Sequence, residues 1–266
     1  MNSSSLHQPS YFDLDWVQNL AREAGQMALQ HFGRTTNTIK PDKTIVTEAD
    51  KAIETFLVEQ LSQRYPEDGV LGEEGTSTRR DARRQWVLDP IDGTAAFSVG
   101  YPSWCVSIGM LEDGIPRAGV VYLPVSDDMF AVDLTGPATF NGEAIQVMSY
   151  EPFDNNSGML CSGDIHSHWQ IDFPGKVRAL GSLAIHICYV AKGSAVASIN
   201  SYSSLWDVAA ALPILERAGG TTTLLDGSPL PFAAALDGSK FPQPIVSAPL
   251  AYLDDIRSRL RFRPGE

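Results

Sequence analysis

Apolar side chains repeat at helical spacing in two stretches near the N-terminus. Between residues 13 and 33 they fall at steps of three and four, and Gly33 follows as a stop signal. The second stretch begins at Thr47, which stands three residues before Asp50 as in a capping box, and it ends before Pro66. The spacing predicts two amphipathic helices in the first quarter of the chain.

A strand pattern replaces the helical one between residues 105 and 133. The runs "CVSIGMLEDG" and "IPRAGVVYLP" meet at Asp113-Gly114, a pair typical of hairpin turns. Short strands are predicted near residues 70–71 and 85–88, and another over 129–132. The stretch "NGEAIQV" opens with a further turn pair. This part of the chain therefore predicts an antiparallel sheet.

The second half mixes both patterns after the irregular polar segment "SYEPFDNNSG". A strand, a helix over 182–192, a strand over 194–199 and a helix over 207–218 follow one another. Pro213 lies inside the last helical pattern, so that helix either starts later or bends there. Helices followed by a meander favour a layered α+β architecture. The expected organisation is a flexible N-terminal tail (1–10), an N-terminal α+β lobe (11–150) and a C-terminal α/β lobe (151–266).

Composition and charge narrow the function classes. The 266 residues carry a formal net charge of −12, which would repel nucleic acid phosphates, so nucleic acid is not an expected partner. No apolar run approaches the roughly 20 residues of a membrane-spanning helix, and no signal peptide pattern opens the chain. Three widely spaced cysteines favour neither a disulfide framework nor a zinc site. A cytoplasmic protein without membrane contact is expected.

The stretch "LDPIDGT" places two acids, Asp89 and Asp92, three residues apart around a proline. A turn would explain one of them but does not need both. Three further acids have ordinary explanations when each is taken alone. Glu73 could face solvent at a strand end, Asp207 could be a helix N-cap, and Asp50 has its capping role. A hard divalent cation prefers such carboxylate ligands, and bound cations would also allow an anionic substrate to approach this acidic protein.

The segments "IVTEAD", "GEE", "LDPIDGT" and "WDVAA…AGG" occur in this order over most of the chain. Together with "GVVY" and "FNGE" they resemble the inositol monophosphatase family, the lithium-sensitive, magnesium-dependent phosphatases. The resemblance implies an αβαβα layered sandwich, a homodimer, and hydrolysis of a small phosphorylated metabolite with two or three Mg²⁺ ions.

The resemblance also implies roles for individual residues. One metal would be held by Glu73, Asp89 and the carbonyl of Ile91. A second would be held by Asp89, Asp92 and Asp207, and a third, weaker ion by Glu73 and waters. The attacking water would be oriented by Thr94, with Asp50 hydrogen-bonded behind it. Whether Glu73 or the Thr94–Asp50 pair accepts the proton stays open.

Departures from the family pattern concern the substrate pocket. Ala95-Ala96 replace a more polar pair, Leu183 adds bulk after Gly181-Ser182, and Asn200 stands where inositol-specific members carry a glutamate. The expected substrate-binding residues are Asp92, Gly93, Thr94, Gly181, Ser182, Leu183, Asn200 and Asp207. The segments "KPDKTIVTEAD" and "AALPILERAGG" are also similar to histidinol-phosphate phosphatases.

Several other residues are expected to have structural roles only. His166 and His168 are too few to form a metal site, His186 suits an interior hydrogen-bonded histidine, and Cys105 suits packing. The basic run 79–84 is expected to be a solvated loop.

The predicted function is a magnesium-dependent phosphomonoesterase. Inositol monophosphate or a related sugar phosphate is the first candidate substrate. Histidinol phosphate, fructose bisphosphate and phosphoadenosine phosphate are alternatives. A non-catalytic regulator that binds metal or phosphate is a different class of answer, but it would not need the water-orienting residues Asp50, Glu73 and Thr94.

Overall fold

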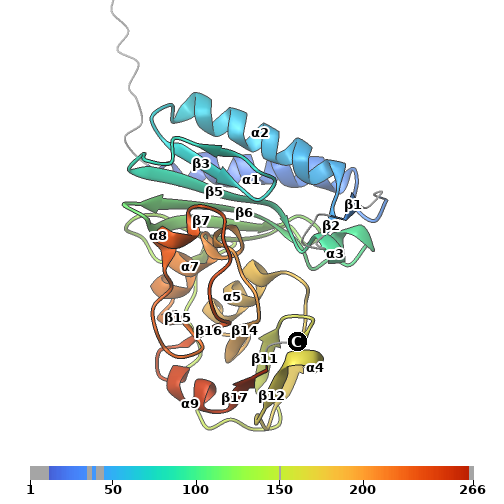
Figure 1. The fold of residues 1–266 in the computed structure, drawn as a ribbon, viewed down its shortest axis with the longest axis vertical. Helices are drawn as coiled ribbons and strands as arrows, with labels where there is room; N and C mark the ends of the chain where they lie inside the picture. Colours follow the sequence, from blue (N-terminus) through green and yellow to red (C-terminus); the bar gives the residue numbers. More distant parts are fainter. Residues whose placement is uncertain (1–11, 35–37, 40–44, 150, 264–266) are drawn as a thin grey trace, which may run out of the picture.

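The computed structural model describes residues 12–34, 38–39, 45–149 and 151–263 (Figure 1). The expected N-terminal tail lies outside the described residues. The helices are α1 (Leu14–Leu29), α2 (Glu48–Arg64), α3 (Thr94–Ser98), α4 (Ile165–His168), α5 (Leu183–Ala191), α6 (Leu205–Val208), α7 (Ala211–Arg217), α8 (Phe232–Ala235) and α9 (Leu253–Ser258).

Among the described residues, the strands form two larger sheets and two small strand pairs. The strands are β1 (Thr38–Ile39), β2 (Ile45–Val46), β3 (Gly69–Gly72), β4 (Ser77–Thr78), β5 (Arg84–Asp92), β6 (Cys105–Glu112), β7 (Ile115–Leu123), β8 (Asp128–Val132), β9 (Thr139–Phe140), β10 (Glu143–Ala144), β11 (Gly158–Cys161), β12 (Trp169–Ile171), β13 (Lys176–Arg178), β14 (Ala197–Asn200), β15 (Gly220–Leu224), β16 (Ile245–Pro249) and β17 (Leu260–Phe262). The first sheet has the order β10-β9-β8-β7-β6-β5-β3-β4 and the second β13-β11-β14-β16-β15. The small pairs are β1-β2 and β12-β17.

The first sheet is antiparallel except where β3 runs parallel to β5. The predicted hairpin between β6 and β7 is confirmed, and both its turn residues, Asp113 and Gly114, have positive φ angles of 52° and 76°. In the second sheet β11 is parallel to its neighbours β13 and β14, and β16 is antiparallel to its own.

Helices and sheets alternate in five layers (Figure 1). Helices α1 and α2 cover one face of the first sheet, and α5 and α7 fill the space between the two sheets. Helix α9 packs on the far face of the second sheet. The αβαβα sandwich is therefore confirmed.

Alternation along β5 divides the first sheet between two cores. Trp86 and Leu88 pack with α1 and α2, whereas Val87 points to the opposite side, toward α5 and α7. All three side chains are almost fully buried. Burying an apolar side chain of this size stabilises a fold by roughly 1.5–3 kcal/mol. The same alternation directs Asp89 to the α5 and α7 side.

Local sequence signals set several helix ends. The capping box of α2 is confirmed, because Thr47 and Asp50 each bond the other's backbone N–H. The helix predicted over 13–33 ends at Leu29, and turns follow. The pattern over 207–218 is divided between two helices, α6 and α7, and the alternative that the second helix starts later is confirmed. Pro213 lies in the first turn of α7, where no intrahelical donor is needed.

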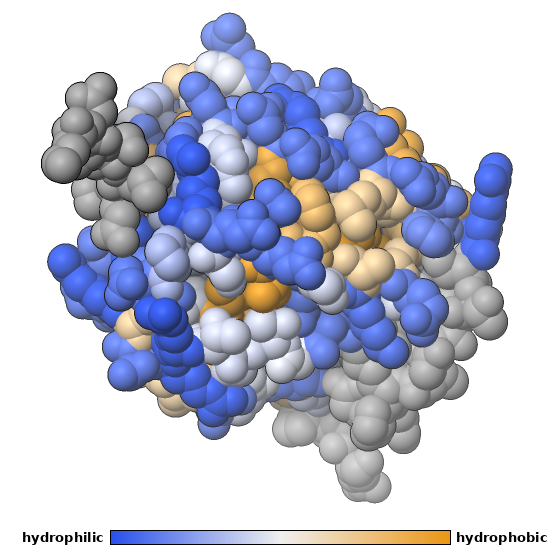
Figure 2. Space-filling view, turned by 90° about the horizontal axis from the view of Figure 1, so that it is seen from above, coloured by the Kyte–Doolittle hydropathy of each residue, from blue (hydrophilic) through white to orange (hydrophobic). Residues whose placement is uncertain are grey.

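The outer face over α1 and α2 is mostly hydrophilic, with hydrophobic residues visible mainly near its centre (Figure 2). Among the described residues, no helix combines the length and the apolar character needed to cross a membrane.

Candidate active site

An irregularity in β5 brings two carboxylates to one face of the sheet. Asp89 pairs with Ser107 and Asp92 with Cys105, so three residue steps on β5 match two on β6. In a regular strand residues three apart point to opposite faces, and one extra residue reverses that. The side chain of Ile91 packs instead among the residues under α1 and α2. The turn considered for these two acids is not what the structure shows, because β5 continues through Pro90 to Asp92 as a bulged strand.

Gly93 ends the bulge in a conformation that favours glycine. Its φ angle is +99°, and a Cβ atom there would lie 3.1 Å from the Ser103 carbonyl oxygen and 3.3 Å from that of Gly181. The chain then enters the short helix α3 at Thr94.

The start of α5 fixes the carboxylate of Asp92. The Ser182 hydroxyl and the Ala184 amide each donate to Oδ2 at 2.6 Å, and the Leu183 amide donates to Oδ1 at 3.3 Å. The Ser182 hydroxyl also accepts from the Ile185 amide at 3.2 Å and so caps the helix. One serine therefore ties the N-terminus of α5 to the first sheet.

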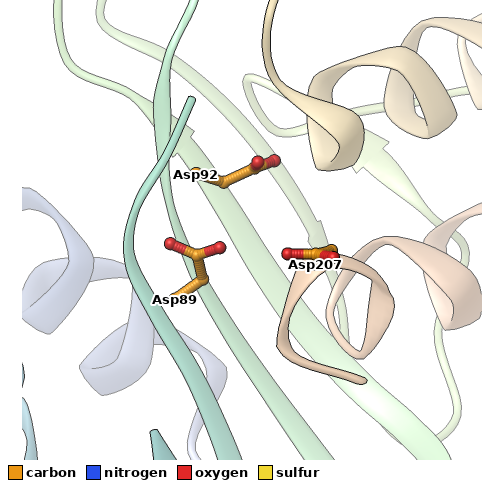
Figure 3. A group of neighbouring side chains, drawn as sticks. All are labelled: Asp89, Asp92 and Asp207. Atoms are coloured by element: carbon orange, nitrogen blue, oxygen red, sulfur yellow. The ribbon is translucent and has the colours of Figure 1, made fainter. Parts of the chain in front are cut away.

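Asp207 reaches the same place from α6. Its Oδ2 accepts a hydrogen bond from the Ser204 amide at 2.6 Å, in a capping box in which Ser204 is the N-cap. The predicted N-cap role of Asp207 is therefore wrong, because Asp207 occupies the third position of the helix. The cap uses Oδ2 of Asp207. Figure 3 shows the Asp207 carboxylate pointing toward Asp89 on β5.

The carboxylates of Asp89, Asp92 and Asp207 point toward one another (Figure 3). Each offers an oxygen, and these oxygens lie within 4.8 Å of one another. Asp89 and Asp92 are buried, while Asp207 is partly exposed. Such a group of acids is suited to hold hard divalent cations.

Electrostatics within this group favours a bound cation. Burial, followed by the charges of Glu73 and Asp92, holds the pKa of Asp89 well above its ordinary value. Burial and then the charge of Asp92 raise the pKa of Asp207 well above its ordinary value, and Glu73 adds to this. Burial also raises the pKa of Asp92, against the hydrogen bonds from α5. Positive charge placed among these groups would relieve the repulsion.

Asp50 and Thr94 form a pair beside the acidic group. Asp50 is fully buried, and its Oδ2 accepts from the Thr47 amide at 2.7 Å and the Thr47 hydroxyl at 2.5 Å. Its Oδ1 lies 3.4 Å from the Thr94 hydroxyl, which is also 3.0 Å from the Ile91 carbonyl oxygen. Because a hydroxyl has one proton, Thr94 donates to one of these acceptors at a time. Asp50 therefore uses Oδ2 for capping, and its Oδ1 is the oxygen nearest the Thr94 hydroxyl.

A pocket of about 220 Å³ opens next to the acidic group. It is lined by Asp92, Ser162, Gly163, Gly181, Leu183, His186, Asn200, Tyr202 and Asp207. Five of these were expected from the sequence. The other three expected residues do not line this pocket: Ser182 is buried and bonds Asp92, Gly93 packs near Ser103 and Gly181, and the Thr94 hydroxyl lies near Asp50 and the Ile91 carbonyl.

Comparison with known proteins decides the family. The model of the inositol monophosphatase family matches residues 14–244. This chain belongs to the inositol monophosphatase family. It is a phosphomonoesterase of a magnesium-dependent family, and the acidic group Asp89, Asp92 and Asp207 could bind the metal.

Two relatives and one solved structure illustrate the similarity. A fructose-1,6-bisphosphatase/inositol-1-monophosphatase of Thermotoga maritima is 33% identical over 227 residues, covering 80% of this chain and 85% of the relative. A histidinol-phosphatase of Mycobacterium tuberculosis is 34% identical over 233 residues, covering 82% and 89%. The structure of a Thermotoga maritima IMPase aligns with a TM-score of 0.81 at 27% identity, covering 92% of this chain and 94% of that one.

A histidine and an amide form one wall of the pocket in this family member. Burial lowers the pKa of His186 to about 4, so the ring is neutral near pH 7. Its Nε2 lies 3.1 Å from the Leu180 amide and must accept, which leaves Nδ1–H to donate to Asn200 Oδ1 at 3.4 Å. The Asn200 amide donates in turn to the Ser198 hydroxyl at 2.9 Å. The expected interior histidine is confirmed, and it also lines the pocket.

Four pocket residues were absent from the expected set: Ser162, Gly163, His186 and Tyr202. Ser162 and Gly163 follow β11, and Tyr202 follows β14, and these two strands are neighbours in the second sheet. The sequence did show that small or polar residues directly follow each of these strand patterns. Strand pairing, which brings these ends together, was not readable from the sequence.

Other residues singled out in the sequence lie outside this pocket. His166 and His168 belong to the short helix α4, not to a strand. The basic run is largely exposed as expected, apart from Arg84, which pairs with Asp68 at 2.8 Å. Cys105 is buried as expected, and its Sγ lies 3.4 Å from the Ser182 hydroxyl.

Proposed function

We propose that this protein is a magnesium-dependent phosphatase that hydrolyses a small phosphorylated metabolite at this pocket. The observation that carries the proposal is the convergence of Asp89, Asp92 and Asp207 at the pocket, with Asp92 and Asp207 also lining it. Mutual repulsion would make so acidic a site unfavourable without cations, and the family's chemistry requires them.

The proposed metal ligands are Glu73, Asp89, the Ile91 carbonyl, Asp92 and Asp207, holding two or three Mg²⁺ ions. The raised pKa values of Asp89 and Asp207 support the inclusion of Glu73, because the charge of Glu73 contributes to both shifts. When bound, the cations would neutralise phosphate oxygens and stabilise the leaving alkoxide.

The protein's own groups would orient the attacking water and take its proton. Thr94 is placed for this, since its hydroxyl can donate to the buried carboxylate of Asp50 and accept from a water. Glu73 is the alternative proton acceptor. Backbone amides of Gly93 and Thr94, at the start of α3, would bind phosphate oxygens.

For the substrate, inositol monophosphate or a related sugar phosphate is the first candidate. The wall of His186 and Asn200 is uncharged. Both ring nitrogens of His186 are engaged within the wall, whereas the Asn200 amide has a second N–H beyond its bond to Ser198 that could bind a hydroxyl group. The names of the relatives keep fructose bisphosphate and histidinol phosphate as alternatives. Phosphoadenosine phosphate is a further one. A homodimer is proposed from the family resemblance.

The test is release of inorganic phosphate from a panel of these esters by purified protein with Mg²⁺. Asp89→Asn is the control, because it removes a ligand proposed to serve two ions. Turnover by the wild type that Asp89→Asn abolishes would support the proposal. Binding of Mg²⁺ and phosphate without turnover of any ester would instead indicate the non-catalytic regulator.

A further inference from the structure

An aromatic ring forms one side of the pocket without being buried. Tyr202 lines the pocket together with Asp92 and Asp207, yet 54% of its surface is exposed to solvent. A large ring this exposed contributes little to the core. Its position next to the acidic group gives it access to whatever alcohol the phosphate is attached to.

Neighbouring aromatic rings hold Tyr202 in place. Its ring centroid lies 6.1 Å from that of Phe262 and 6.4 Å from that of His168, both at steep angles. Phe262 in turn lies 4.9 Å from Trp169, with which it pairs across β12 and β17. These edge contacts leave the Tyr202 ring supported from outside the pocket.

Hydrogen bonds fix the side chain of Ser201, the residue before Tyr202. The Trp169 indole donates to the Ser201 hydroxyl at 2.8 Å, and that hydroxyl lies 2.8 Å from Asp164 Oδ1. Asp164 Oδ1 also accepts from Ser162 at 2.5 Å, and Asp164 is not among the residues that line the pocket. The ring of Tyr202 is therefore preorganised at the pocket.

The remaining surface near Tyr202 is small and uncharged. Ser162 and Gly163 also line the pocket, and a Cβ atom on Gly163 would meet nothing within 4 Å. Neutral His186 and the amide of Asn200 complete the wall. The pocket thus combines an aromatic face, open space and neutral hydrogen-bonding groups, which suits a planar ring that carries polar atoms.

We propose that Tyr202 is a specificity-determining residue that packs against a planar nitrogen heterocycle in the alcohol part of the substrate. Such a ring occurs in a mononucleotide as a base and in histidinol phosphate as imidazole. The inference rests on the proposed phosphatase function. In the reaction, water adds to phosphorus and the phosphorus–oxygen bond to the alcohol breaks. The alcohol leaves with a proton from that water.

The experiment compares esters that differ in the ring. The ring-bearing 2′-AMP is matched with glycerol 2-phosphate, and histidinol phosphate with phosphoethanolamine, which keeps an ammonium group but has no ring. Because a ring of this kind stacks favourably on an aromatic side chain, we expect Tyr202→Ala to lower kcat/KM for a ring-bearing ester roughly tenfold. The matched ring-free ester should change less than about twofold, and Tyr202→Phe should retain the preference. Tyr101→Ala is the control, since Tyr101 is 65% exposed but lies outside the pocket lining.

A binding measurement separates recognition of the ring from catalysis. Adenosine and histidinol carry the ring but no phosphate, and titration calorimetry without Mg²⁺ should show weaker binding of one of them to Tyr202→Ala. The arm that responds identifies the ring as purine or imidazole. If Tyr202→Ala lowers kcat/KM equally for ring-bearing and ring-free esters, or for neither, the inference is overturned. Phosphate release by the wild type would in that case leave the proposed function intact. Absence of phosphate release from every ester, with ring binding that depends on Tyr202, would overturn only the proposed function.

Discussion

Asp89 and Thr94 lie in one site but support different parts of the proposed chemistry. Asp89→Asn removes a charged ligand from the acidic group, whereas Thr94→Ala leaves the three clustered carboxylates intact and removes only a hydroxyl near Asp50. We expect Thr94→Ala to lower kcat by roughly 10²–10⁴, as the loss of a positioned catalytic group commonly does, and Asp89→Asn to lower it further. Steady-state kinetics at saturating Mg²⁺ checks this. Near-normal turnover by Asp89→Asn would contradict the shared-ligand assignment.

The residue at position 200 provides a second prediction at this scale. Asn200 is 1% exposed and accepts from the His186 ring, so a glutamate there would place a charge against the pocket wall. Hydrogen bonds to charged groups contribute roughly 1.5–3 kcal/mol against 0.5–1.5 for neutral ones, a difference that changes selectivity by less than about tenfold. Asn200→Glu should raise relative activity on inositol phosphate and histidinol phosphate and lower it on a sugar bisphosphate. Competition assays with paired substrates measure the ranking, and an unchanged ranking would place Asn200 outside the substrate contacts.

At the scale of elements, local patterns predicted those parts whose signals are continuous in the chain. The capping box of α2 and the hairpin at Asp113-Gly114 rest on neighbouring residues, and both are confirmed. The bulge at Pro90 was not predictable, because it is defined by pairing with β6, and the turn residues around it suggested a loop. Strands of two or three residues, such as β4 and β12, carry no period that could reveal them.

In the site too, some residues were predictable from local motifs, whereas others depend on contacts between distant segments. Asp89, Asp92 and Asp207 were identified from their motifs and from the family resemblance, and the structure brings them together. The aromatic surroundings of Tyr202 were not predicted, because Phe262 reaches Tyr202 only when the C-terminal strand β17 pairs with β12. Contacts between such distant segments depend on tertiary assembly, not on local spacing.

Helix α5 is tied to the acidic group by a single side chain, and this predicts a combined defect. Ser182→Ala removes the N-cap of α5 and one of the hydrogen bonds to Asp92. Loss of an N-cap typically costs about 1 kcal/mol, and Mg²⁺ affinity should fall as well because Asp92 loses one of the three hydrogen bonds that orient it. Asp13→Ala, which removes the N-cap of α1 away from the site, should destabilise the protein without changing Mg²⁺ affinity. Denaturant unfolding and Mg²⁺ titration check both, and Ser182→Ala with unaltered Mg²⁺ affinity would contradict the coupling.

On the scale of the whole molecule, the site lies where layers meet. Asp89 and Asp92 come from the first sheet, while α5 and α6, which belong to the layer between the sheets, contribute the hydrogen bonds to Asp92 and the carboxylate of Asp207. Repulsion among these acids therefore acts across the junction between layers, and it should affect stability as well as activity. A cation bound there would join the first sheet to the middle helices.

This arrangement predicts a pH-dependent stability in the absence of metal. The pKa of Asp89 and that of Asp207 are raised well above their ordinary values in the folded state. Between the unfolded and the folded pKa, the folded protein binds more protons than the unfolded chain, so the free energy of unfolding falls as pH rises through that window. In chelator, Asp89→Asn should therefore melt at a higher temperature than the wild type at pH 7.5. The difference should shrink as pH approaches the ordinary carboxyl pKa of about 4, because the unfolded chain then also takes up protons. Excess Mg²⁺ should reverse the order at pH 7.5, because only the wild type keeps the complete ligand group. Thermal melts from pH 4.5 to 8, with and without Mg²⁺, measure this. An Asp89→Asn protein that is less stable than the wild type in chelator at pH 7.5 would show that the acidic group does not strain the metal-free fold.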